Sequence, residues 1–220
     1  MVEQPEASAY LRAQMGGEAA EPVVVFDIGN VLLRWDPRFL YERIFDDRTR
    51  MESFLAEICT PAWNIELDRG GRFDEAVAAL SAQHPHFEAE IRAFDERWLE
   101  MIPHAIAENV AVLEALKNAG RPVYAITNFS AEKFIVAREN FPFLDSFDGV
   151  VVSAHERLIK PDAAIYEVFF SRYGLRARDC VFIDDSAANI ETAVALGMQA
   201  VHFVEGVDVA ARLRDCGCRF

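Results

Sequence analysis

Five short apolar runs, rich in β-branched and aromatic residues, alternate with longer amphipathic segments along most of this chain. The runs are residues 23–26, 123–126, 150–152, 180–183 and 200–203. Each run is too short for a helix, and its unbroken apolar character is typical of a strand in a parallel sheet that helices cover on both faces. The alternation therefore predicts an α/β fold with a Rossmann-like, doubly wound parallel sheet.

Glycines mark the ends of the predicted helices between these strands. Residues 106–119, 163–173 and 190–196 have a helical pattern, and Gly120, Gly174 and Gly197 follow them directly. Glycine is common just after the last turn of a helix, because it adopts the left-handed conformation at little cost. The glycine positions thus agree with a helix that ends before each following strand.

The segment from residue 36 to residue 103 breaks the alternation. Its helical patterns cover residues 37–45, 50–58, 73–81 and 87–101, with no convincing strand among them. We expect residues 36–103 to form an inserted all-helical cap, residues 22–35 and 104–220 to form the Rossmann-like core, and residues 1–21 to be a disordered N-terminal extension. Such a cap would lie over the carboxyl edge of the sheet, where ligands bind in open α/β folds.

The charge balance limits the partners of the chain. Its 36 acidic residues exceed its 22 lysines and arginines, for a formal net charge of −14. This excess argues against a nucleic acid or an anionic membrane as the partner, because both attract basic surfaces. An anionic small molecule would have to be held by a local group of positive side chains.

The sequence also carries no secretion signal, no apolar stretch long enough to span a membrane and no cysteine pattern of a zinc site or disulfide framework. We therefore expect a cytoplasmic protein. Cys216 and Cys218, close to the C-terminus, are expected to be exposed, reduced thiols.

Polar signals follow four of the five apolar runs. They are Asp27, the pair Thr127 and Asn128, Lys160, and the pair Asp184 and Asp185. Because parallel strands end at the same edge of a sheet, these side chains should share one pocket. Acidic groups so close together repel unless a cation neutralises them, and hard oxygen ligands suit Mg²⁺. A magnesium ion, a lysine and a carboxylate nucleophile together indicate phosphoryl transfer through an aspartyl-phosphate.

Each signal also has a purely structural interpretation. An aspartate after a strand commonly caps a turn or helix, as Asp27, Asp184 or Asp185 could do. Thr127 and Asn128 could cap a following helix, and a Lys-Pro-Asp step often begins one. The coincidence of four such sites at one sheet edge favours a catalytic pocket.

The ordered set FDIGNVL, ITN, IKPD and FIDDS resembles the four motifs of the haloacid dehalogenase superfamily, in the C1, subfamily IA branch with a helical cap. The resemblance implies that Asp27 is the nucleophile and that Thr127, Asn128 and Lys160 bind and neutralise the phosphoryl group. It further implies a Mg²⁺ ion held by Asp27, the Gly29 carbonyl and Asp185, with Asp184 in support.

Gly29 departs from the pattern of most phosphatases in this superfamily. They read Asp-x-Asp, and the second aspartate protonates the leaving group. Dehalogenases lack that aspartate, so a metal-free 2-haloacid dehalogenase that uses Asp27 is an alternative. The Asp184–Asp185 pair instead favours a phosphatase, and FDIGNV with this pair resembles sugar-phosphate phosphatases such as bacterial α-glucose-1-phosphate phosphatase. A second alternative is a catalytically impaired protein that binds phosphorylated ligands.

Four further residues complete these expectations. Asp36 could supply the missing acid, although an aspartate before Pro37 more often caps a helix. Trp63 and Arg69, the latter in the turn at residues 68–71, could contact the substrate from the cap or serve only as a packing anchor and a loop. Arg157 stands where similar proteins often have glycine. The sequence thus predicts a Mg²⁺-dependent phosphatase that acts on small phosphorylated metabolites, sugar phosphates among them.

Overall fold

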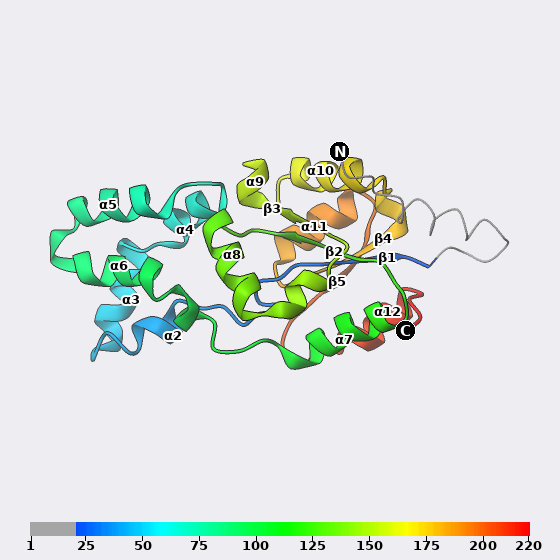
Figure 1. The fold of residues 1–220 in the computed structure, drawn as a ribbon, viewed down its shortest axis with the longest axis horizontal. Helices are drawn as coiled ribbons and strands as arrows, with labels where there is room; N and C mark the ends of the chain where they lie inside the picture. The colour runs from blue at the N-terminus through cyan, green and yellow to red at the C-terminus, as the bar shows by residue number, and fades with distance from the viewer. Residues whose placement is uncertain (1–20) are drawn as a thin grey trace.

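A computed structural model describes residues 21–220 and contains a five-stranded parallel sheet in the order β3-β2-β1-β4-β5 (Figure 1). The strands are β1 Val23–Phe26, β2 Val123–Thr127, β3 Gly149–Val152, β4 Cys180–Asp184 and β5 Gln199–His202. All five lie where the apolar runs predicted them, and the Rossmann-like fold class is confirmed. In the central strand, Val25 lies opposite Tyr124 on one side and Phe182 on the other.

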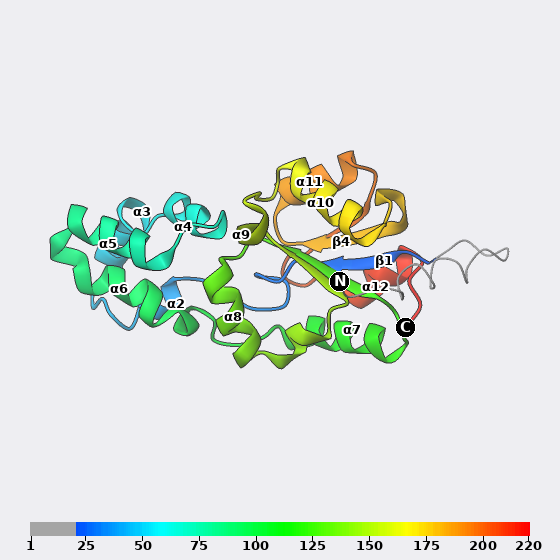
Figure 2. The same ribbon diagram turned by 45° about the horizontal axis from the view of Figure 1, so that its top comes forward.

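Helices cover both faces of the sheet (Figure 2). One face carries α10 (Ala163–Tyr173) and α11 (Ala187–Ala195), and the other carries α7 (Ala107–Asn118), α8 (Ala131–Asn140) and α12 (Val209–Asp215). Successive residues of a strand point to opposite faces. Val25 accordingly packs in one apolar cluster with Phe169 of α10, while Val24 and Phe26 belong to the other. This double burial accounts for the unbroken apolar runs.

Helices of the segment after β1 gather at one end of the molecule (Figure 1). They are α2 Arg38–Tyr41, α3 Arg48–Glu57, α4 Pro61–Asp68, α5 Phe73–Gln83 and α6 Glu88–Glu96, with 3-10 turns η1 Pro85–Phe87 and η2 Trp98–Met101. We call this body the cap and the sheet with its helices the core. Tyr41 and Phe54 pack within the cap with ring centroids 4.9 Å apart.

Three details of the cap differ from the sequence prediction. The helix predicted at residues 37–45 is only one turn, α2, and the one predicted at 87–101 is divided near Arg97, whose φ of −117° and ψ of 24° are not helical. Helix α4 was not predicted at all. Its signal was the Thr-Pro step, since Thr60 accepts a hydrogen bond from the Trp63 amide at 3.1 Å and Pro61 opens the first turn.

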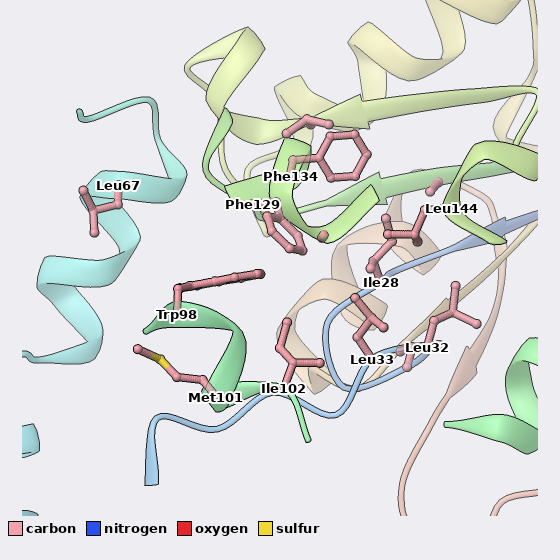
Figure 3. Close-up of a cluster of buried hydrophobic side chains, with 14 of the residues drawn as sticks. Ile28, Leu32, Leu33, Leu67, Trp98, Met101, Ile102, Phe129, Phe134 and Leu144 are labelled. Carbon is pink, nitrogen blue, oxygen red and sulfur yellow. The ribbon is translucent and has the colours of Figure 1, made fainter. Parts of the chain in front are cut away.

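Apolar side chains join the cap to the core (Figure 3). Trp98 of η2 lies against Phe129, which follows β2, with ring centroids 5.6 Å apart. On the core side of this cluster lie Ile28 and Leu33 from the loop after β1. Because Ile28 and Leu33 follow β1 and Phe129 follows β2, this contact places the cap at the carboxyl edge of the sheet. Burial of such side chains is the main source of favourable free energy in packing.

Two further expectations concern the ends of the chain. Cys218 is only 2% exposed, so the expectation of an exposed thiol is wrong there; it packs near Pro22, and burial raises its pKa to about 12. Cys216 is half-buried. The N-terminal extension falls, apart from residue 21, outside the described residues. Within residues 21–220, no helix combines the length and the apolar character needed to cross a membrane.

Candidate active site

The strand order places the predicted side chains side by side. Asp27 directly follows β1, Thr127 ends β2, and Asp184 ends β4, while Lys160 comes from the loop after β3. Asp27, Gly29, Asn128, Lys160 and Asp185 line one cavity of about 350 Å³, here called the edge cavity. The structure therefore brings the residues of all four sequence motifs to a single site.

Lys160 lies between two carboxylates at the base of the edge cavity. Its Nζ is 2.9 Å from Oδ1 of Asp27 and 2.6 Å from Oδ2 of Asp184, and its side chain is 1% exposed. Burial opposes a charged ammonium, but the attraction of the two carboxylates prevails and raises the pKa of Lys160. The lysine is thus held as a cation beside Asp27.

Asp27, Asp184 and Asp185 each offer a carboxylate oxygen, and these oxygens lie within 4.8 Å of one another. One lysine cannot balance three carboxylates. Burial, with the charges of Asp184 and Asp185, raises the pKa of Asp27, and burial with Asp184 raises that of Asp185. A divalent cation would relieve both repulsion and desolvation, so the donor set fits Mg²⁺, which prefers carboxylate and carbonyl oxygens.

The two adjacent aspartates have different surroundings. Asp184 is fully buried, accepts from the Asn189 side-chain amide at 2.9 and 3.0 Å, and accepts from the Ser186 amide at 2.8 Å. Asp185 is half-buried and lines the edge cavity. Asp184 is therefore engaged by the start of α11, whereas Asp185 faces the ligand space.

Thr127 and Asn128 serve the site in different ways. The Oγ1 of Thr127 is buried and has no hydrogen-bond partner within residues 21–220, which is uncommon for a buried polar atom and fits a phosphate oxygen as its partner. The Asn128 side chain instead pairs with the Lys160 main chain: its Nδ2 donates to the carbonyl at 3.0 Å, and its Oδ1 accepts from the amide at 2.8 Å. Asn128 thus positions the lysine loop, a role that its place in the sequence did not predict.

The loop after β1 leaves room at Gly29. A Cβ atom built at this residue meets nothing within 4 Å, so the position that carries an aspartate in most related phosphatases is not sterically blocked. Asn30 adopts a φ of 52°, and its Oδ1 accepts from the Trp35 amide at 3.0 Å. Oδ1 of Asp27 accepts from the Ile28 amide at 2.7 Å, whereas its Oδ2 makes no hydrogen bond among the described residues.

Three predicted residues lie away from the edge cavity. Oδ1 of Asp36 accepts from the amide of Arg38 at 2.9 Å. Trp63 packs edge-on against Phe94 within the cap, with ring centroids 5.0 Å apart. Arg69 is exposed and lies 3.5 Å from Glu66. None of the three is among the residues that line the edge cavity.

Asp68 enters the edge cavity from the cap, at the end of α4. The sequence hypothesis for the turn at residues 68–71 named Arg69 but not this aspartate. Oδ2 of Asp68 accepts from the Asn64 side chain at 3.0 Å, and its main-chain oxygen accepts from Ser153 at 2.5 Å. Burial raises its pKa to about 7, and the charge of Asp27 adds to this effect. No local signal distinguished it, because its burial depends on residues of the core.

A second cavity, here called the cap cavity, has a volume of about 650 Å³. Leu55, Cys59 and Phe94 form apolar parts of its wall, and Asp36 also lines it. It shares four lining residues with the edge cavity, which are Asn30, Trp35, Asn64 and Ile65. The two cavities therefore adjoin, and a molecule anchored at Asp27 could extend into the cap.

Comparison with known proteins places this site in a family. The family model for haloacid dehalogenase-like hydrolases matches residues 22–197. The chain belongs to this family and is a hydrolase of its Rossmann-like fold. Sesquiterpene phosphatase astK of Aspergillus oryzae is 30% identical over 196 residues, which cover 88% of this chain and 96% of the relative.

Two solved structures share the fold. A HAD family enzyme of Bacteroides thetaiotaomicron, solved as a magnesium complex, has a TM-score of 0.72 at 18% identity and covers 89% of this chain and 100% of its own. L-2-haloacid dehalogenase of Xanthobacter autotrophicus, with chloropropionic acid covalently bound, has a TM-score of 0.60 at 16% identity and covers 88% and 82%. The shared fold thus accommodates both an enzyme that binds magnesium and a dehalogenase.

Proposed function

We propose that this protein is a Mg²⁺-dependent phosphatase that hydrolyses small phosphorylated metabolites through an aspartyl-phosphate on Asp27. One observation carries the proposal: a buried lysine lies between Asp27 and Asp184 beside a third carboxylate, with the unpartnered hydroxyl of Thr127 at the end of the next strand. One sheet edge then provides the nucleophile, a cation and a hydroxyl that can donate a hydrogen bond to phosphate. The 30% identical phosphatase supports the same activity.

Asp27, the Gly29 carbonyl and Asp185 would hold the magnesium ion, with Asp184 in support. When bound, Mg²⁺ supplies a Lewis acid that neutralises charge on the phosphoryl oxygens. Oδ2 of Asp27, which no described residue engages, attacks phosphorus, and the bond from phosphorus to the leaving oxygen breaks. Water then attacks the aspartyl-phosphate, which releases inorganic phosphate and restores the Asp27 carboxylate.

Lys160 and Thr127 act on the phosphoryl group itself. The Lys160 ammonium, already 2.9 Å from Asp27, neutralises the charge that develops on the transferring oxygens. The Thr127 hydroxyl donates to a phosphate oxygen. Asn128, predicted to bind phosphate, contributes chiefly by fixing the main chain of Lys160.

The leaving group is proposed to be organic and partly apolar. The cap cavity adjoins the edge cavity and has Leu55, Cys59 and Phe94 in its wall. The related phosphatase is named for sesquiterpenes, which favours the same class. Sugar phosphates, and the finer assignment to the C1, subfamily IA branch with a likeness to α-glucose-1-phosphate phosphatase, stay predictions from the sequence motifs. The cytoplasmic location and the absence of nucleic-acid and membrane partners also stay predictions, made from the charge and composition of the chain.

A dehalogenase is the second candidate, favoured by Gly29 and by the shared fold with L-2-haloacid dehalogenase. Its carboxylate substrate would approach the clustered Asp27, Asp184 and Asp185, which repel an anion unless a cation is present. A binding protein that has lost turnover is the third. It would retain phosphate affinity without releasing phosphate from any ester.

One set of assays distinguishes these functions. Phosphate release is measured from an isoprenyl monophosphate and glucose 1-phosphate, with Mg²⁺ and with chelator, beside halide release from 2-chloropropionate. Metal-dependent phosphate release that Asp27→Asn abolishes is the expected result. Asp145→Asn is the control, because Asp145 is an exposed aspartate paired with Arg138. Metal-independent halide release would establish the dehalogenase instead.

A further inference from the structure

The proposed phosphatase reaction needs a proton for the leaving oxygen, and Gly29 has no side chain to give one. Of the acidic groups in the edge cavity, Asp27 is the nucleophile and Asp185 belongs to the metal cluster. Asp68 is the remaining acid there, and it comes from the cap rather than the core. It therefore lies on the side from which the leaving group would depart.

The carboxyl group of Asp68 is held in place without being neutralised. Asn64, one turn earlier in α4, donates to its Oδ2 at 3.0 Å, and the Ser130 main chain also interacts with it. Within residues 21–220, no lysine, arginine or histidine forms an ion pair with Asp68; Lys160, the lysine of the same cavity, is taken by Asp27 and Asp184. A carboxyl that is positioned yet unpaired is free to carry a proton.

Burial brings the pKa of the Asp68 carboxyl close to neutral pH. Desolvation raises the pKa of Asp68 to about 7, and the Asp27 charge acts in the same direction. An acid whose pKa lies near the operating pH is suited both to give and to take a proton. Asp36, the donor suggested by sequence, lies instead at the cap cavity with its Oδ1 near the Arg38 guanidinium at 3.3 Å.

We propose that Asp68 is the general acid and base of this enzyme, a catalytic role that the cap supplies in place of residue 29. As Asp27 attacks phosphorus and the ester bond breaks, Asp68 gives its proton to the leaving oxygen and becomes a carboxylate. That carboxylate then removes a proton from the water that attacks the aspartyl-phosphate. The phosphorus–Asp27 bond breaks, inorganic phosphate leaves, and Asp68 is again protonated.

This inference rests on the proposed phosphatase activity, and leaving-group dependence tests it separately. In Asp68→Asn, kcat/KM for an alkyl phosphate, whose leaving oxygen needs a proton, should fall about 10²- to 10³-fold. For p-nitrophenyl phosphate, whose leaving group departs as an anion, kcat/KM should fall less than about tenfold. The kcat of Asp68→Asn for p-nitrophenyl phosphate should fall more than its kcat/KM, because the attack of water on the phosphoenzyme still lacks the base. Intact-mass spectrometry should then detect accumulated phosphoenzyme.

Two additional variants make the test specific. Glu66→Gln is the matched control, since Glu66 is an exposed acid on the same helix. This variant should keep the wild-type kcat/KM for both substrates. Adding Gly29→Asp to Asp68→Asn should raise kcat/KM for the alkyl phosphate at least about tenfold above that of Asp68→Asn alone, because a Cβ fits at residue 29.

If Asp68→Asn lowered kcat/KM equally for both substrates, and Gly29→Asp did not restore it, the role of Asp68 would be overturned. A wild-type protein that releases no phosphate from either ester would instead contradict the phosphatase itself. Circular dichroism of each variant separates these outcomes from misfolding.

Discussion

The Ser153 hydroxyl lies 2.5 Å from the main-chain oxygen of Asp68 and accepts a hydrogen bond from the Phe129 amide at 2.9 Å. Ser153 is fully buried at the start of α9 (Ser153–Glu156). A single core side chain thus links the end of cap helix α4 to the segment that follows β2. Asp68 lines the same cavity as Asp27, and we expect this link to help hold it there.

Ser153→Ala should weaken both stability and catalysis. It removes the donor to Asp68 and leaves the buried Phe129 amide without its acceptor, so we expect the free energy of unfolding in urea to fall by about 1–3 kcal/mol. Activity on an alkyl phosphate should decline more than activity on p-nitrophenyl phosphate. Ser171→Ala, at an exposed position of α10, is the control. Unchanged unfolding and unchanged activity would show that the contact contributes nothing.

Mg²⁺ should stabilise the folded protein through the carboxylate cluster. Because the unfolded chain does not assemble Asp27, Asp184 and Asp185, a metal concentration of 100 times Kd should add about 2.7 kcal/mol to the free energy of unfolding. Thermal unfolding measured with Mg²⁺ and with chelator gives the shift in Tm. Asp185→Asn should abolish most of the shift, whereas Asp179→Asn should retain it, because Asp179 pairs with Arg176 in the 3-10 turn before β4. An equal shift in both variants would locate the metal elsewhere.

The titration of Asp68 should appear in the pH dependence of stability. Its pKa is raised from 3.8 to about 7 on folding, so the folded state binds the proton more tightly than the unfolded state. The resulting contribution is complete below pH 4 and is lost as the pH rises through 7, with an upper limit of about 4 kcal/mol. Urea unfolding with chelator between pH 4 and 8 should show this slope in the wild type, and Asp68→Asn should reduce it. If the free energy of unfolding changed with pH in the same way for both proteins, the raised pKa of Asp68 would be contradicted.

Gly70→Ala should disturb the approach of the cap to the core. Gly70 has a φ of +107°, and a Cβ there would lie 2.9 Å from the Ala154 carbonyl oxygen. We expect a loss of about 1–3 kcal/mol in the free energy of unfolding, with lower kcat/KM because Asp68 is two residues away. Gly120→Ala isolates the backbone effect, since Gly120 has a φ of +71° but open space around it. If both variants lost the same free energy, the close contact would have no cost.

The core half of the site could be predicted because it follows from strand geometry alone. Asp27 and Asp184 stand at the ends of apolar runs, and parallel pairing places such ends together whatever the loops do. The cap half could not be predicted in this way. A helical pattern shows that a segment is a helix, but not which of its side chains meets a surface far along the sequence. Asp68 is partly buried and contacts Ser130 and Ser153, which lie far from it in the chain.

Two smaller features of the loops were also not evident from the sequence. Asn128 hydrogen-bonds the Lys160 main chain, 32 residues away, so its side chain also supports the lysine loop, which its place in the sequence did not predict. Arg157, at a position that often carries glycine in similar proteins, adopts a left-handed φ of 58°, the conformation that glycine favours.

The attachment of Asp68 to the cap affects how proteins of this kind could diversify. When the proton donor stands on the core, a cap can be exchanged between homologues to alter substrate choice while the reaction proceeds as before. Here the exchange would remove the donor together with the specificity surface. A chimaera that carries a foreign cap should therefore need an acid restored at residue 29 before it can cleave unactivated esters, and natural relatives with this glycine would be expected to evolve cap and core together.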